Sequence, residues 1–480
     1  MSNGKTKTDI PFRLDRLPWS RWHVLVVVAL GITWILDGLE VTIVGVISDV
    51  LQKPTTLALS SFEAGFLGTA YLIGAVVGAI VFSYLTDKYG RKRLFMITLG
   101  TYIVGTVLSA FSFNFASIAV FRIITGLGIG GEYSAINSAI DELIPARVRG
   151  WVDLAINGSW WVGTMVGSAL SLYLLNPAFF PIDLGWRLSF AVGASLGLAV
   201  LLIRRYLPES PRWLLVHGRE EEAKEVVSEI ENKVSHQTGK ELEEPNKTLE
   251  INPIGSVGFG TVFHSVFGRY PKRAVLGLWL MAGQAFLYNA IFFTYALLLS
   301  KFYGVPVDQT GLYIFPFAIG NFVGPLLIGK LFDTFGRKPM IAFTYIFSGV
   351  LLAITGYLFM IGVLSAITQT LAWVVIFFFA SAGASSAYLT VSEVFPLEIR
   401  AMAIALFYAV GTAIGGVAAP SIFGALIGSG SPVNVFYGYL VGAILMAAAG
   451  VVEIAFGVKA ERKSLEEVAA PLSEVIENPY

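Results

Sequence analysis

The chain has 480 residues, of which 55% are hydrophobic and only 14% are charged, and its formal net charge is zero. A typical soluble domain carries about 25% charged residues, so this composition predicts a membrane protein and gives no sign of a nucleic-acid-binding surface. Cysteine is absent, which excludes disulfides, thiolate metal sites and thiol catalysis.

Apolar runs of about 20 residues are long enough to cross a bilayer as helices. The first half of the chain contains six such runs, at 22–48, 62–86, 94–112, 115–139, 151–175 and 185–206. The second half contains six more, at 274–300, 309–332, 339–363, 368–393, 401–427 and 434–457. The prediction is therefore an all-α membrane protein with twelve transmembrane helices.

Basic residues concentrate in alternate loops, which predicts the orientation of the helices. Lys5 and Arg13 precede the first span, and Lys88 lies between the second and third, whereas the opposite loops carry little beyond Lys53 and Lys301. We expect both termini to be cytoplasmic and the protein to lie in the cell membrane. The polar N-terminus does not resemble a cleaved signal peptide.

The composition changes between the sixth and seventh spans. Residues 219–234 have helical periodicity with charges on one side, and the rest of 207–272 is polar. Four parts are expected: an N-terminal six-helix bundle (1–206), a cytoplasmic linker with an amphipathic helix (207–272), a C-terminal six-helix bundle (273–464) and a cytoplasmic tail (465–480). The acidic tail is expected to be loosely ordered.

Two charged phrases occur once in each half of the chain. Asp87-Lys-Tyr-Gly-Arg-Lys92 returns as Asp333-Thr-Phe-Gly-Arg-Lys338, and Glu142…Arg149 returns as Glu393…Arg400. Each phrase follows a predicted span, in the same order in both halves. Such duplication is typical of secondary transporters, and it predicts two pseudo-symmetric bundles that rock about a central site.

These phrases resemble the signatures of the major facilitator superfamily, over essentially the whole chain. The branch with sugar porters, phosphate and aromatic-acid proton symporters, and synaptic-vesicle transporter-like proteins is indicated by Pro208-Glu-Ser-Pro-Arg-Trp-Leu214 together with Ser392-Glu393…Arg400. The first copy of the signature loop has Ser83 where glycine is usual. The resemblance implies the major facilitator fold and leaves the substrate open.

The repeated charges are expected to hold helix ends together on the cytoplasmic side. The candidate latch residues are Asp87, Arg91, Glu142, Arg149, Asp333, Arg337, Glu393 and Arg400. We expect Asp87 to pair with Arg149, and Glu142 to pair with Arg91 or the 208–214 segment. The alternative is a set of static anchors at the membrane surface.

Charges inside the spans are costly and therefore informative. Asp37 and Glu40 lie in the first span, where a spacing of three places both on one helix face, so we expect both to face a central cavity. They are candidate proton-binding groups. Arg122 is expected to be the sole arginine buried in a span. By resemblance to sugar porters it pairs with Glu40, and the alternative is a direct contact with a carboxylate cargo.

Glu132 follows Gly130-Gly131, and the Gly-Gly-Glu-Tyr sequence resembles that of phosphate symporter-like proteins. We take it as a further candidate proton site in a helix that faces the cavity, against the alternative of a neutral acid bonded to a neighbouring helix. It lies about 15 Å along the helix from Arg122, so the two are not expected to pair. Glu453, near the end of the last span, is expected to reach the membrane surface.

Cargo is expected to meet amides and aromatic rings. Gln284 and Asn289 keep the spacing of the amides in sugar porters, and Asn157 holds a place where those proteins carry glutamine. Buried amides need partners, which makes them the first candidates for substrate binding. Candidate walls are Tyr288, Tyr388, Trp160 and Trp161, and packing or lipid-facing positions are the alternative for these rings.

We expect a proton-coupled symporter of a small polar metabolite (an organic acid, a sugar acid or a sugar) that works by alternating access as a monomer. The partners are its cargo, protons and lipid, without nucleic acid or a cofactor. No Gly-x-x-x-x-Gly-Lys-Ser/Thr loop indicates ATP hydrolysis, and an enzyme is not expected. The alternatives are a proton-independent facilitator and a non-transporting sensor.

Overall fold

The computed structural model describes residues 6–204, 207–245, 247–253, 255, 257–292, 294–306 and 309–474. Eleven helices among these residues are long and apolar enough to cross a membrane. In the first half the spanning helices are α2 (Arg21–Leu51), α3 (Ser61–Tyr89), α4 (Arg91–Ala110), α5 (Phe115–Leu143) and α8 (Ile182–Arg204). In the second half they are α12 (Pro271–Phe292), α14 (Thr310–Thr334), α15 (Arg337–Met360), α16 (Ala366–Glu393), α19 (Pro432–Phe456) and the continuous helical segment Leu397–Gly415, which contains α17 (Arg400–Thr412).

The twelfth span is broken into two helices. α6 (Arg149–Gly158) and α7 (Trp160–Leu174) meet at Ser159, whose hydroxyl donates to the Ile156 carbonyl oxygen at 2.6 Å. Neighbouring glycine and serine are a common site of helix kinks, and each piece alone is too short to span. With this pair included, the expectation of twelve spans is confirmed.

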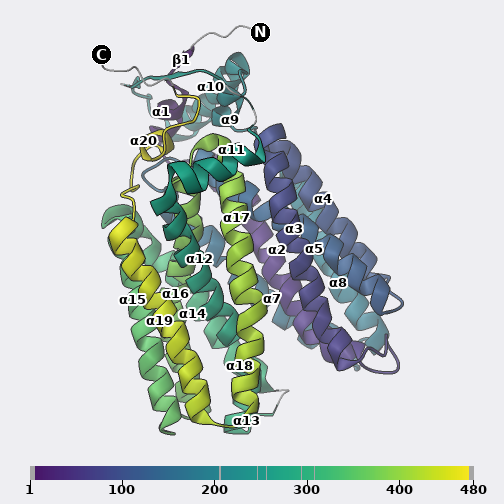
Figure 1. Ribbon diagram of the computed structural model, residues 1–480. Coiled ribbons are helices and arrows are strands. Elements are labelled where there is room, and N and C mark those ends of the chain that lie inside the picture. Colours follow the sequence, from purple (N-terminus) through teal and green to yellow (C-terminus); the bar gives the residue numbers. More distant parts are fainter. Residues whose placement is uncertain are drawn as a thin grey trace.

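Two other spans have irregular ends. α12 is followed by the short α13 (Tyr295–Tyr303), and α17 continues through a π-helical turn, η4 (Ala413–Ala418), into α18 (Ala419–Gly428). These breaks lie away from the linker, toward the end where the two bundles separate (Figure 1).

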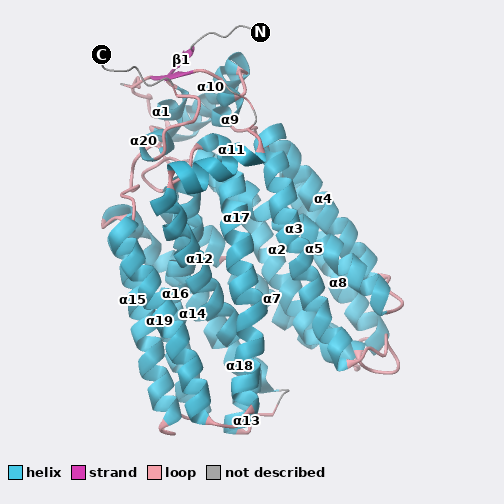
Figure 2. Ribbon diagram, viewed as in Figure 1, coloured by secondary structure: helices cyan, strands magenta, loops and turns pink. Residues whose placement is uncertain are grey.

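The helices form two bundles, α2–α8 and α12–α19, that meet near the linker and diverge toward the other end (Figure 1). The linker packs as a cap of short helices that also holds both ends of the described chain. We name this end of the molecule the linker end. Apart from one pair of short strands in the cap, the described secondary structure is helical (Figure 2).

The cap consists of α1 (Ile10–Asp15), α9 (Pro211–Val216), α10 (Glu220–Thr238), α20 (Leu465–Val468) and the antiparallel strands β1 (Thr6–Thr8) and β2 (Leu249–Ile251). The amphipathic helix expected at 219–234 is α10, which buries Ala223, Val227, Ile230 and Val234. α11 (Phe259–Phe263) and the π-helical η1 (His264–Arg269) then lead into α12.

The tail is packed rather than loosely ordered as far as residue 474, which corrects the expectation from its composition. Glu466 accepts a hydrogen bond from Arg212 at 2.9 Å, and Glu398 accepts from the Ser473 amide at 2.9 Å. Glu466 is thus compensated by Arg212, and Glu467 pairs with Lys247, so part of the acidic charge that predicted a loose tail has cationic partners.

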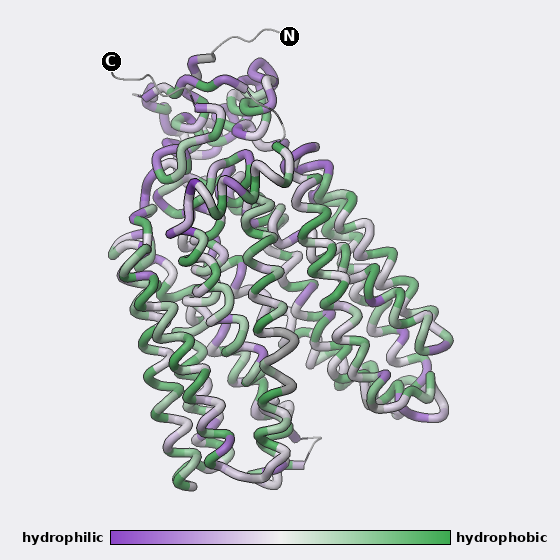
Figure 3. The backbone as a smooth tube through the Cα atoms, in the orientation of Figure 1, coloured by the Kyte–Doolittle hydropathy of each residue, from purple (hydrophilic) through white to green (hydrophobic). Residues whose placement is uncertain are grey.

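Glycines bring α3 and α5 into backbone contact. A Cβ atom on Gly74 or Gly78 would collide with the carbonyl oxygens of Ile123 and Leu127, and one on Gly130 would collide with that of Ala75. Small residues allow this close approach between membrane helices. Apolar residues dominate the two bundles, and hydrophilic ones collect in the cap (Figure 3); this distribution fits a protein whose bundles lie in lipid.

Candidate functional site: a central cavity closed at the linker end

A cavity of about 480 Å³ lies between the two bundles. This volume falls within the range of small-molecule sites, roughly 300–1,000 Å³. Its lining follows α2 from Trp34 to Ser48 and includes Ala64 near the start of α3. The cavity therefore extends from the middle of the molecule toward the end away from the linker.

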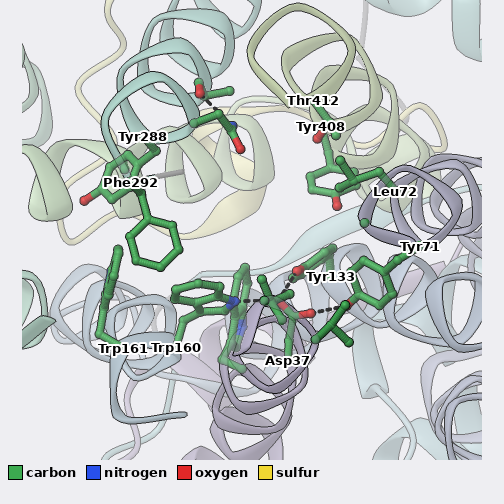
Figure 4. A pocket seen from close by; sticks show the side chains of 18 of the residues that line it. Asp37, Tyr71, Leu72, Tyr133, Trp160, Trp161, Tyr288, Phe292, Tyr408 and Thr412 are labelled. Atoms are coloured by element: carbon green, nitrogen blue, oxygen red, sulfur yellow. Dashed lines mark hydrogen bonds between the residues drawn. The ribbon is translucent and has the colours of Figure 1, made fainter. Parts of the chain in front are cut away.

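Aromatic side chains form much of the wall (Figure 4). Trp160 and Trp161 come from the start of α7, directly after the break at Ser159, and Tyr288 and Phe292 come from α12 in the other bundle. The ring centroids of Trp161 and Phe292 lie 5.2 Å apart in an edge-to-face arrangement. The break thus orients two tryptophans across the gap between the bundles.

Asp37 is the acidic group of the cavity, and its carboxylate accepts three hydrogen bonds. Trp160 Nε1 donates to Oδ2 at 2.5 Å, and the hydroxyls of Tyr71 and Tyr133 also donate to the carboxylate (Figure 4). The donors come from α7, α3 and α5, so one carboxylate connects four helices of the N-terminal bundle. The position expected for Asp37, facing the cavity, is the one observed.

Glu40 turns away from the cavity and pairs with Arg122, as the resemblance implied. Both side chains are buried, and the Tyr102 hydroxyl lies 3.4 Å from Glu40 Oε2. Residues three apart differ by about 60° around a helix, and this offset separates Asp37, which lines the cavity, from Glu40, which does not. The expectation that both carboxylates face the cavity is therefore wrong for Glu40.

Glu132 does not line the cavity, although its helix α5 faces the cavity as expected, through Arg122 and Tyr133. It forms a buried ion pair with Arg204 of α8 and accepts a hydrogen bond from Thr98 of α4. Its lack of pairing with Arg122 agrees with the expected separation along the helix. Arg204 is a second arginine buried in a span, so the expectation that Arg122 is the sole one is wrong. The sequence contained the information for this, because Arg204 lies inside the predicted span 185–206.

The predicted amides Gln284 and Asn289 both line the cavity from α12. Asn289 Nδ2 donates to the Ala285 carbonyl oxygen at 2.7 Å, and Gln284 Nε2 lies 3.9 Å from the weak acceptor Met281 Sδ. Tyr288, between them, donates to Asn321 Oδ1 at 2.7 Å. The two amides are placed where cargo can reach them.

Asn157 and Tyr388 line the same cavity from α6 and α16. Asn157 Nδ2 donates to Asn137 Oδ1 and Asp153 Oδ2, each at 3.2 Å. Tyr388 packs edge-on against Trp34 across the bundle interface, with centroids 5.5 Å apart. Glu453 is buried rather than at a surface, and its Oε2 has no hydrogen-bond partner in the described part of the chain.

The latch residues form the same arrangement twice. Arg91 contacts Asp87 at 3.3 Å and Glu142 at 2.7 Å. Its counterpart Arg337 contacts Asp333 at 2.7 Å and Glu393 at 3.0 Å. The expected pairing of Glu142 with Arg91 and the 208–214 segment is observed, since Arg212 also donates to the Glu142 carbonyl oxygen at 2.5 Å.

The acids of the latch also join the bundles. Asp87 accepts from the Met402 amide of α17 at 3.1 Å, and Asp333 accepts from the Trp151 amide of α6 at 2.8 Å. Each acid thus lies at the start of a helix of the other bundle, where an anion is stabilised. The expected pairing of Asp87 with Arg149 is wrong, because this helix start takes the acid instead.

Arg149 and Arg400 complete the contact between bundles. Arg149 contacts Asp15 of the cap at 3.0 Å and Glu393 at 3.8 Å, and Arg400 lies 3.7 Å from Glu142. These contacts hold the cavity closed at the linker end.

Two bundles of spanning helices around a central cavity closed at one end define a membrane transporter. The family model described as "Sugar (and other) transporter" matches residues 26–471, and the chain belongs to this family within the major facilitator superfamily. It is a multi-pass membrane protein that carries small molecules, and it is not an enzyme.

Characterised relatives carry different cargoes. The chain is 30% identical to the niacin transporter NiaP of Acinetobacter baylyi, over 96% of this chain and 99% of the relative. It is 26% identical to the 4-hydroxybenzoate transporter PcaK of the same organism, over 73% and 74% of the two chains. The solved structure of the proton:xylose symporter XylE with a bromodeoxyglucose superposes with a TM-score of 0.75 at 20% identity, over 93% and 98% of the chains.

Proposed function

We propose that the protein is a proton-coupled symporter of the cell membrane that carries a small organic acid, with an aromatic acid as the best match. The linker end would then be cytoplasmic, in agreement with the basic loops, and the cavity would open to the outside. The observation that carries this proposal is the position of Asp37, a buried carboxylate on the cavity wall next to the aromatic side chains of Tyr71, Tyr133 and Trp160.

Protonation of Asp37 gives a direct route for coupling. The ionised carboxylate accepts from Trp160 and from the hydroxyls of Tyr71 and Tyr133. The neutral acid carries no charge and is a donor at one oxygen, so it holds these three donors less strongly and leaves them free to turn toward a new partner. A carboxylate cargo is a suitable acceptor, and the neutral Asp37 no longer repels it. Proton binding thereby prepares the cavity for an anion.

The wall favours a flat ring over a saturated one. Trp160, Trp161 and Phe292 present aromatic faces and edges, and Gln284 and Asn289 offer both donors and acceptors for ring substituents. Relatives that carry niacin and 4-hydroxybenzoate support this choice. A sugar would use the same amides but gains less from the aromatic rings. One proton carried with a monovalent anion moves no net charge, so the pH gradient supplies the driving force for that step. Each further proton would add ~2.3 kcal/mol per 100 mV of membrane potential.

Uptake into proteoliposomes with an imposed pH gradient tests the proposal. Nicotinate, 4-hydroxybenzoate, benzoate and xylose are supplied in turn, with and without an uncoupler. We expect accumulation of an aromatic acid that collapses with the uncoupler. In Asp37→Asn, accumulation should be lost, while exchange of cargo across the membrane continues.

Three outcomes would contradict parts of the proposal. Accumulation of xylose in preference to the acids would contradict the cargo class. Uptake that ignores the uncoupler would indicate a facilitator. Unchanged accumulation in Asp37→Asn would remove Asp37 from coupling. Glu222→Gln, at the exposed surface of α10, is the matched control because it removes an acid far from the cavity.

A further inference from the structure

A pair of buried acids, Asp141 and Asp153, lies outside the latch contacts described above. Asp141 is on α5 and Asp153 is on α6, and both side chains are fully buried. Neither Asp141 oxygen, nor Asp153 Oδ1, has a hydrogen-bond partner among the residues that the structure describes. Isolated carboxylates are very costly to bury, so such groups are normally paired or neutral.

The helix register brings the two acids together. Asn137 and Asp141 are one turn apart on α5, as are Asp153 and Asn157 on α6, and such residues share a helix face. The two asparagines touch, with Asn157 Nδ2 at 3.2 Å from Asn137 Oδ1. Because the chain reverses between α5 and α6, Asp141 lies opposite Asp153. Like charges this close inside a protein cannot both ionise without a large cost.

The neighbouring arginines form their ion pairs with other acids, although Arg149 Nε and Arg400 Nη1 have no hydrogen-bond partner in the described part of the chain. The charged and titratable groups that act on the pair come from α5, α6, α15, α16 and α17, and they are Glu142, Arg149, Arg337, Glu393 and Arg400. Arg337 binds Asp333 and Glu393, Arg149 binds Asp15, and Arg400 donates to the Ser392 carbonyl oxygen at 2.7 Å. Glu393 adds negative charge rather than removing it. The Ser392 hydroxyl donates to the Leu389 carbonyl oxygen at 2.8 Å.

The pair of acids lies between the cavity and the linker end. Asn157 lines the cavity and hydrogen-bonds to Asp153, while Glu393, which acts on both acids, belongs to the latch of the other bundle. No group of three or more acids and histidines with a metal-holding arrangement occurs among the described residues. A proton is therefore the ligand that this pair best accommodates.

We propose that Asp141 and Asp153 bind one proton between them at the bundle interface, and that this proton holds the linker end closed. When the proton is bound, one carboxyl donates a hydrogen bond to the other, and water remains excluded from the contact between the bundles. Without the proton, the pair carries two negative charges that face Glu393 of the other bundle, and this repulsion between the bundles opens the linker end to water. Acidification at the linker end then stabilises the closed state. This gate is separate from coupling through Asp37 and does not depend on the nature of the cargo.

The test measures opening of the linker end without cargo or membrane potential. Because the chain has no cysteine, Tyr89→Cys and Phe335→Cys place spin labels only at two exposed positions, one on each bundle at this end. Distance distributions are recorded by pulsed electron paramagnetic resonance in nanodiscs over a pH series. We expect the ratio of long to short distances to rise up to about tenfold per pH unit through the titration. In Asp141→Asn/Asp153→Asn, which removes both negative charges and the titration, the short distance should persist at every pH.

An equal pH slope in the double variant would overturn the proposal. If the double variant does not fold, each single Asn variant serves, since either one removes the repulsion and should flatten the slope. Glu453→Gln is the matched control, because it neutralises a buried acid of the C-terminal bundle and should leave the slope unchanged. Infrared spectra give a second measurement: the wild type should show a buried carboxylic acid band that Asp141→Asn lacks, and an identical spectrum would contradict proton binding. Loss of proton-driven uptake in Asp37→Asn tests coupling alone, so the two proposals fail separately.

Discussion

Glu132 and Arg204 form an ion pair that is fully buried between α5 and α8. Arg204 also donates to Thr33 of α2 and, at 3.1 Å, to the Ala29 carbonyl oxygen. The pair therefore ties α8 to the helix that carries Asp37, and its place inside one bundle gives it a structural role.

Replacing Arg204 with Met should destabilise the protein strongly. Breaking a buried ion pair from one side typically costs 3–5 kcal/mol, because the remaining charge stays buried without a partner. Thermal unfolding in detergent should show a marked fall in Tm, partly restored in Glu132→Gln/Arg204→Met. The control is Arg219→Ala, whose pair with Glu222 is about half exposed and should contribute about 0–1 kcal/mol. An unchanged Tm in Arg204→Met would contradict the structural role.

Replacing Arg122 distinguishes its pairing with Glu40 from a direct contact with cargo. In the structure Arg122 binds Glu40 and stacks on the Tyr71 ring at 4.7 Å, so Arg122→Ala should lower Tm and alter the pH profile of uptake. Affinity for an anionic cargo should change only modestly. Titration calorimetry with nicotinate and a neutral analogue measures this. A loss of several kcal/mol confined to the anion, with the pH profile intact, would indicate a carboxylate clamp.

Replacing Gln284 or Asn289 with Ala should weaken cargo binding without unfolding the carrier. Each amide that bonds to cargo contributes about 0.5–1.5 kcal/mol, which corresponds to a two- to tenfold increase in Kd at the substituted site. Asn434→Ala, an exposed amide at the start of α19, is the control. If Kd stays the same in both cavity variants, the cargo meets other residues.

The N-terminal helix α1 should detach from α10 at low pH. Burial alone would raise the pKa of Glu231, but hydrogen bonds from Arg13 (2.5 Å) and Arg16 (2.7 Å) outweigh it and hold this pKa below its usual value. A carboxyl group whose pKa is lower in the folded state stabilises that state when the pH is above the unfolded pKa, about 4.3. This stabilisation is lost as the pH falls through the lower pKa of the folded state. Hydrogen exchange of residues 10–15, measured relative to the intrinsic exchange rate at each pH, should therefore become faster below about pH 4 in the wild type.

Glu231→Gln should show this faster exchange already at neutral pH. Lys224, which forms exposed pairs on the same helix, provides the control as Lys224→Gln. Protection of residues 10–15 that does not depend on pH or on Glu231 would mean that α1 is held by its apolar contacts alone.

The sequence predicted the parts of the fold that depend on local pattern. The lengths of the apolar runs and the duplicated phrases predicted the spans and the two bundles, and the Gly-Arg-Lys copies at Arg91 and Arg337 predicted equivalent latches. Partners were harder to predict, because they depend on how helices pack. Asp87 lies at the start of α17 and does not pair with Arg149, and Arg204 of the sixth span forms an ion pair with Glu132. Within the candidate site, Asp37, Gln284 and Asn289 lie on the cavity as predicted, whereas a small rotation along α2 turned Glu40 away.

The glycine contacts between α3 and α5 determine how the N-terminal bundle responds to force. Helices that touch through their backbones have no flexible side chains between them that could be compressed, and protein interiors are already poorly compressible. Free energy released at Asp37, which accepts from residues of both α3 and α5, is then dissipated little as deformation inside the bundle. It acts instead on the position of the whole bundle, so a chemical event at one carboxylate is converted into displacement of the half-molecule that contains it.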